Sequence, residues 1–245
     1  MSYLSTQEAT RTCILSKRWN HLQTSFPILD FDLIYFEEKD STTRRKERKI
    51  YNINKFLHFV DASLLRFSEA KVSIQKFRLS MEVFDVEGVA SLLEKWIELA
   101  VTNEVKELDL NVQISNDRIK RLGLNVQKNK DMMCSLSGTI FSAKFVTTLK
   151  LGGFNLEQSS AYTIRFHSLK KLALEGVHID EQLVQKFISE CPLLEDLFLS
   201  LCMHCIRICI AHAPRLRILK IVSFPSNFCD GYKFLSDVES IEIVA

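Results

Sequence analysis

One short stretch of this sequence brings together side chains that could bind a metal. Cys202, Cys205 and Cys209 are separated by two and three residues, and His204 and His212 lie close by. Thiolates and imidazoles at such spacing are the ligands of structural zinc sites. A buried Cys can instead fill space and make weak hydrogen bonds at a turn. We favour the packing role, because Cys202 ends a repeated apolar pattern described below, and we predict no metal site.

Catalytic motifs are absent from the sequence. It contains no glycine-rich phosphate loop, no His-Glu-x-x-His and no Gly-x-Ser-x-Gly, which are the short motifs with a known chemical role. The six histidines are scattered along the chain at His21, His58, His167, His178, His204 and His212. We therefore predict that the protein is not an enzyme and needs no cofactor.

The composition is that of an ordinary globular protein. Hydrophobic residues make up 47% of the 245 residues and charged residues 25%, with a formal net charge of +2. This small charge does not favour a nucleic acid partner. The N-terminus does not resemble a signal peptide, and no apolar run reaches the ~18 residues that span a membrane. The seven cysteines have no framework-like spacing, so we expect free thiols and a location in the cytoplasm, the nucleus or both.

Pairs of apolar residues, one residue apart, recur through the second half of the chain. The pairs begin at Leu149, Leu172, Leu197, Leu219 and, more weakly, Ile241, at intervals of 22 to 25 residues. In a strand, alternate residues share a face, so each pair points into the core together. A repeat of this length with Leu-x-Leu at its centre is typical of leucine-rich repeats, which stack into a parallel sheet on a curved solenoid.

Helical periodicity marks three further segments. Apolar residues recur every three or four positions from Ile50 to Phe67, from Val89 to Ala100, and after Asp180, which can cap a helix that ends before Pro192. Strands are expected at 77–81 and 105–110, and the near copy of 105–113 at 119–127 is expected to form a hairpin or an irregular insertion.

The charged run at 37–49 could be a nuclear-import or nucleic acid patch, but we favour a solvated segment.

The first 32 residues carry a resemblance. Ser5-Thr-Gln-Glu8 reads as a capping box, and Leu15-Ser-Lys-Arg-Trp19 is followed by Leu22 at helical spacing, then Phe26-Pro27. This stretch resembles the second half of a plant-type F-box, and 167–199 resembles the leucine-rich repeats of plant F-box proteins.

The resemblance implies a small helical module that docks on a Skp-type adaptor, which joins it to a cullin scaffold. By similarity, the adaptor-facing or module-core positions are Leu4, Ala9, Leu15, Ser16, Trp19 and Leu22. In the family the module opens earlier, with a Leu-Pro helix that has no counterpart here. We therefore expect a partial F-box, with either a truncated module or a weakened adaptor contact.

The strand alternation also predicts the surface that would hold a substrate protein. Side chains between the paired leucines should line the concave face in three columns of four residues. The first column is Thr148, Lys171, Asp196 and Ile218; the second is Lys150, Ala173, Phe198 and Lys220; the third is Gly152, Glu175, Ser200 and Val222. We predict substrate contacts at Lys150, Lys171, Glu175, Asp196, Phe198 and Lys220. Phe198 is a plausible binding hot spot, although each position is equally consistent with an ordinary solvated strand residue.

These observations predict an α/β fold, a leucine-rich-repeat solenoid preceded by a partial all-α F-box. The expected divisions are a partial F-box at 1–32, a charged loop and linker helix at 33–75, and repeats at 76–245. The resemblance implies the substrate receptor of a Skp–cullin–F-box ubiquitin ligase, with an unknown protein substrate and no membrane partner. The alternative is a protein-interaction module whose F-box no longer reaches the adaptor.

Overall fold

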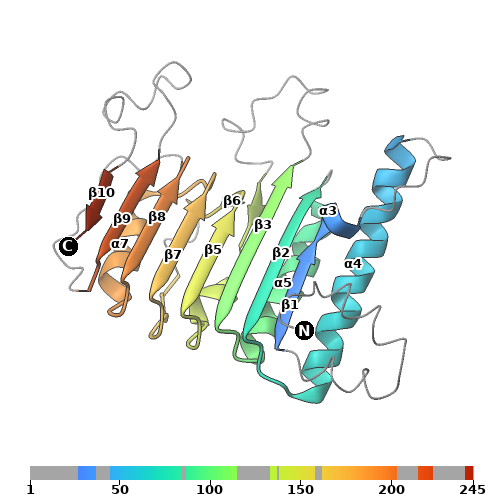
Figure 1. Ribbon diagram of the computed structural model, residues 1–245, viewed down its shortest axis with the longest axis horizontal. Coiled ribbons are helices and arrows are strands. Elements are labelled where there is room, and N and C mark those ends of the chain that lie inside the picture. Colours follow the sequence, from blue (N-terminus) through green and yellow to red (C-terminus); the bar gives the residue numbers. More distant parts are fainter. Residues whose placement is uncertain are drawn as a thin grey trace.

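The fold is built around one large sheet (Figure 1). The computed structural model describes residues 27–36, 45–83, 87–114, 133–136, 138–157, 162–202, 215–222 and 241–244. Within them, eight strands lie side by side in the order of the sequence. These strands are β1 (Ile28–Asp32), β2 (Lys76–Val83), β3 (Glu107–Ile114), β5 (Thr148–Gly152), β7 (Lys171–Glu175), β8 (Asp196–Ser200), β9 (Ile218–Val222) and β10 (Ile241–Val244). Two short strands, β4 (Cys134–Ser135) and β6 (Phe154–Asn155), pair separately.

The repeated leucine pairs bring the strands into register. Leu149 lies beside Leu172, Leu172 beside Leu197, and Leu197 beside Leu219. All four are at most 5% exposed. The repeat interval therefore corresponds to one strand of a parallel sheet, as predicted from the spacing, and the stacked leucines form a continuous core because no single strand could bury its own apolar face.

The helices pack on the face of the sheet that carries these leucines. They are α3 (Leu33–Phe36), α4 (Arg45–Ala70), α5 (Glu87–Thr102), the 3-10 helix η3 (Gly138–Ser142) and α7 (Glu181–Glu190). Figure 1 shows α5 and α7 behind the sheet and α4 beside β1. The three predicted helices are all present. The Asp180 side chain caps α7 by accepting a hydrogen bond of 2.7 Å from the backbone N–H of Leu183.

A polar contact joins α4 to α5 within this layer. Asp61 on α4 accepts hydrogen bonds from Nζ of Lys95 at 2.7 Å and from Nε1 of Trp96 at 3.0 Å, both on α5. The hydrogen bond from Lys95 lowers the pKa of Asp61, burial acts in the opposite direction, and the Trp96 bond lowers it further. Because the Trp96 side chain is fully buried, Asp61 satisfies a donor that would otherwise be isolated from water.

Two strands depart from the sequence-based expectations. Residues 28–32 were assigned to the F-box module, but they form β1, which pairs in parallel with β2, so the sheet begins well before residue 76. The weak fifth copy at Ile241 was expected to continue the parallel stack, but β10 is antiparallel to β9. Both errors arise because alternation reveals a strand and its faces but neither its partner nor its direction.

The described residues therefore form an α/β structure with a mostly parallel sheet and helices on one face. No helix among them combines the length and apolar character needed to cross a membrane.

Candidate interaction surface

The side chains that alternate with the buried leucines form a second face of the sheet, called here the open face. It comprises the residues of β1–β9 that point away from the helices. Its central row runs from strand to strand in register as Asp30, Arg78, Asp109, Lys150, Ala173, Phe198 and Lys220. The three columns predicted from the sequence, each with one residue from β5, β7, β8 and β9, are confirmed in this register.

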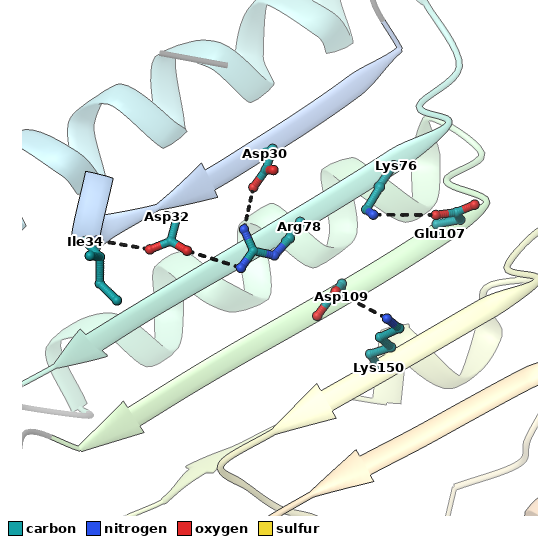
Figure 2. Close-up of polar contacts among 8 residues, drawn as sticks. All are labelled: Asp30, Asp32, Ile34, Lys76, Arg78, Glu107, Asp109 and Lys150. Atoms are coloured by element: carbon teal, nitrogen blue, oxygen red, sulfur yellow. Dashed lines mark hydrogen bonds and ion pairs between the residues drawn. The ribbon is translucent and has the colours of Figure 1, made fainter. Parts of the chain in front are cut away.

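At the β1 edge, Arg78 links two carboxylates (Figure 2). Its guanidinium donates hydrogen bonds to Oδ1 of Asp30 at 2.9 Å and to Oδ2 of Asp32 at 3.1 Å. Oδ1 of Asp32 also accepts the backbone N–H of Ile34 at 3.0 Å, at the start of α3. Burial of Arg78 lowers its pKa, but the hydrogen bonds to both carboxylates outweigh burial and leave the pKa raised. This fork holds β1 against β2.

Ion pairs continue from strand to strand across the open face. Nζ of Lys76 lies 3.8 Å from a carboxylate oxygen of Glu107, and Nζ of Lys150 lies 4.0 Å from one of Asp109 (Figure 2). Opposite charges at neighbouring positions of adjacent strands stabilise the sheet by a few tenths of a kcal/mol to about 1 kcal/mol per pair. The acidic and basic residues of β1–β5 therefore largely satisfy one another.

A further ion pair lies farther along the face. Nζ of Lys171 on β7 is 2.7 Å from a carboxylate oxygen of Asp196 on β8. The hydrogen bond that Lys171 donates to this carboxylate raises the pKa of Lys171, although the lysine remains largely exposed. Like the ion pairs of β1–β5, this contact joins a basic and an acidic residue on adjacent strands.

The rest of β7–β9 differs in character. Phe198 is half-buried, with Ala173 beside it on β7 and Lys220 beside it on β9. Ile218, at the start of β9, leaves 38% of its surface exposed. Apolar surface is thus concentrated at this end of the open face.

The structure places all six predicted substrate-contact residues on the open face. Lys150 is on β5, Lys171 and Glu175 on β7, Asp196 and Phe198 on β8, and Lys220 on β9. Sequence reasoning missed the charged residues of β1–β3, including Asp30, Arg78 and Asp109. The alternation of Asp30 and Asp32 with buried Leu29 and Phe31 was a usable signal, but it did not reveal that β1 belongs to the sheet.

The predicted adaptor-facing residues lie outside the described part of the chain. These are Leu4, Ala9, Leu15, Ser16, Trp19 and Leu22. Their placement stays a prediction from the resemblance.

The possible zinc ligands are only partly described. Cys202 is 8% exposed, and its Sγ lies 3.5 Å from the carbonyl oxygen of Leu174 and 3.6 Å from that of Ser200. These are the weak turn contacts expected for a buried repeat cysteine. The other residues of the predicted stretch, 204–212, lie outside the described residues. No group of three or more metal-binding side chains gathers within the described ranges.

The chain is similar to plant proteins. Residues 93–228 match the family model described as FBD-associated F-box protein At5g56370, LRR repeats. The F-box/FBD/LRR-repeat protein At5g56420 of Arabidopsis thaliana is 28% identical over 247 residues, covering 100% of this chain and 51% of that protein. The putative F-box/LRR-repeat protein At5g41840 of the same plant is 30% identical over 204 residues, covering 82% and 34%. The chain thus spans between about a third and a half of the length of these relatives. No solved structure matches it.

Proposed function

Because the chain belongs to the plant F-box/leucine-rich-repeat family, we propose that it is the substrate receptor of a Skp–cullin–F-box ubiquitin ligase. Residues 1–26 would dock on the adaptor through the predicted positions, Trp19 among them, and the repeats, curved as a solenoid, would hold a target protein on the open face. The receptor would have no chemistry of its own and would act in the cytoplasm, the nucleus or both.

The observation that supports this function most directly is the division of the sheet into two faces. One face is covered by α5 and α7 (Figure 1), whereas the open face extends over seven strands in register and carries mostly polar and charged side chains. Such a broad, polar surface fits a protein partner better than a small molecule, which usually binds in an enclosed apolar pocket.

Tethering is the mechanism that this arrangement favours. A target bound on the open face would be held near the ubiquitin-loaded enzyme on the cullin scaffold, so its lysines would experience a high effective concentration of the donor. The position of Pro27, which directly follows residues 1–26 in the sequence, supports this mechanism. The carbonyl oxygen of Pro27 accepts hydrogen bonds from the backbone N–H groups of Gln75 at 2.7 Å and Lys76 at 3.1 Å, so the chain is already fixed to the start of β2 at this residue.

Co-purification with a plant Skp-type adaptor tests this proposal. We expect the full chain to form a stable complex with the adaptor, Trp19→Ala to abolish it, and Phe198→Ala on the open face to leave it intact. If neither this chain nor one extended by a Leu-Pro helix binds the adaptor, the ligase role is wrong. The protein would then be the interaction module that forms the second candidate.

A further inference from the structure

The charged residues of the open face are not equally available to a partner. Across β1–β5 ion pairs join acidic to basic side chains, and Lys171 is joined to Asp196. Within the described residues, Glu175 on β7 and Lys220 on β9 take part in no such ion pair. A partner can therefore bind either of them without separating an existing pair.

These two opposite charges lie on either side of the apolar centre. Phe198 on β8 is the register neighbour of Lys220, and Glu175 is the neighbour of Ser200, two residues farther along β8. Beside Phe198 on β7 stands Ala173, which carries only a methyl group and is the smallest neighbour of Phe198 in this row. We call Ala173, Glu175, Phe198, Ile218 and Lys220 the β8 patch.

The positions in the sheet set the spacing that a ligand must match. Glu175 and Lys220 are two strands apart, about 9.6 Å across the sheet, and offset by two residues, about 6.6 Å along it. The two positions are therefore about 12 Å apart, with Phe198 close to the line between them. An extended peptide places residues i, i+2 and i+4 on one face over about 13 Å.

We propose that the β8 patch recognises an extended segment of the target protein with the pattern basic–x–apolar–x–acidic, in either chain direction. The basic residue pairs with Glu175, the apolar side chain packs against Phe198 and Ala173, and the acidic residue pairs with Lys220. This inference rests on the proposed function, because it assigns the target's binding site to one end of the same open face. Charge complementarity selects the segment, while the half-buried ring supplies the anchor.

Selection from a displayed library of random nine-residue peptides against the purified full chain tests the pattern. We expect enriched peptides to carry the basic, apolar and acidic residues at alternate positions. Glu175→Lys should replace the basic residue of the selected peptides by an acidic one, and Lys220→Glu should have the converse effect. The matched control is Lys76→Glu combined with Glu107→Lys, which exchanges the ends of an ion pair elsewhere on the face, keeps the net charge, and should leave the selected pattern unchanged.

A synthetic peptide from the selection then tests the anchor. Its affinity, measured by fluorescence anisotropy, should fall about tenfold or more in Phe198→Ala, with circular dichroism confirming that the variant is folded. Enrichment of no pattern, or of one that follows the Lys76 and Glu107 exchange instead of Glu175 and Lys220, overturns the inference. Adaptor binding is read separately, so a chain that binds the adaptor but fails this selection refutes the β8 patch alone.

Discussion

The fork at Arg78 leads to a quantitative prediction about how β1 is held in the sheet. Arg78 binds two carboxylates at similar distances, 2.9 Å to Asp30 and 3.1 Å to Asp32. The two differ in burial, since the Asp30 side chain is 36% exposed and that of Asp32 only 9%. A charged group shielded from water depends more on its partner, so the two contacts should differ in strength.

The expected magnitudes follow from these exposures. A partly exposed ion pair such as Arg78 with Asp30 contributes about 0.2–1 kcal/mol. A hydrogen bond to a charged, largely buried carboxylate such as Asp32 contributes about 1.5–3 kcal/mol. Arg78→Met keeps most of the aliphatic stem but removes both contacts, and should lower the free energy of unfolding by about 3 kcal/mol.

A double-mutant cycle separates the two contacts. Urea unfolding would be measured for Arg78→Met, Asp30→Asn, Asp32→Asn and both double variants. Asn at either position is isosteric, and at position 32 it keeps an oxygen for the N–H of Ile34. We expect the coupling energy of Arg78 with Asp32 to be at least twice that with Asp30, and added salt to weaken mainly the Asp30 coupling. Equal couplings, or a larger one for Asp30, would refute the reasoning from burial.

Three further predictions concern the layer behind the sheet and its turns. Asp61→Asn should lower the free energy of unfolding by about 1 kcal/mol at pH 7. Because the folded-state pKa of Asp61 is lowered, this stability difference is fully present above the unfolded-state pKa of about 3.9 and disappears as the pH falls through the folded-state pKa. Urea unfolding at several pH values measures the difference. A difference that does not change with pH would contradict the assignment. Gly153→Ala should cost about 3 kcal/mol, because φ is +76° and a Cβ would clash with the backbone oxygen of Val112 on β3. Gly176→Ala, at φ +57° in open space, should cost only about 1 kcal/mol, and equal thermal shifts for the two variants would be inconsistent with the clash. Burial raises the pKa of the Cys134 thiol to about 11 and that of the Cys191 thiol to about 12. Mass spectrometry should therefore find both thiols resistant to alkylation by iodoacetamide at pH 8 until the protein is denatured. Rapid alkylation in the native state would refute their burial.

Where local periodicity and tertiary contacts agree, the sequence predicts the structure closely. In α7 the helical periodicity predicted after Asp180 corresponds to the buried side chains, and the expected cap is present. The buried residues are Leu183, Val184, Phe187 and Ile188. Both signals are local, because they depend on residues three or four positions apart. The leucine pairs were equally readable, since their nearly constant interval leaves one simple stacking order for β5, β7, β8 and β9.

The ends of the sheet show why the rest could not be predicted. Asp30 and its partner Arg78 are 48 residues apart, and α4 lies between them, so no constant interval connects β1 with β2. Two residues of β10, Ile241 and Ile243, alternate like a repeat strand, but period two is the same for parallel and antiparallel strands. Pairing that depends on the path of a long connection leaves no trace in a short window of residues.

The same limit applies to function on the open face. The alternation of β5 identifies Lys150 as a residue of this face, but its partner Asp109 is 41 residues upstream, across an interval that breaks the repeat. The sequence therefore lists Lys150 and Lys220 as equivalent lysines, whereas in the structure only Lys150 has a carboxylate within 4.0 Å. A partner that binds Lys150 must compete with Asp109, while one that binds Lys220 meets no such competition among the described residues. Selectivity on this face thus depends on which charges the fold has already paired, and this is a property of the tertiary structure.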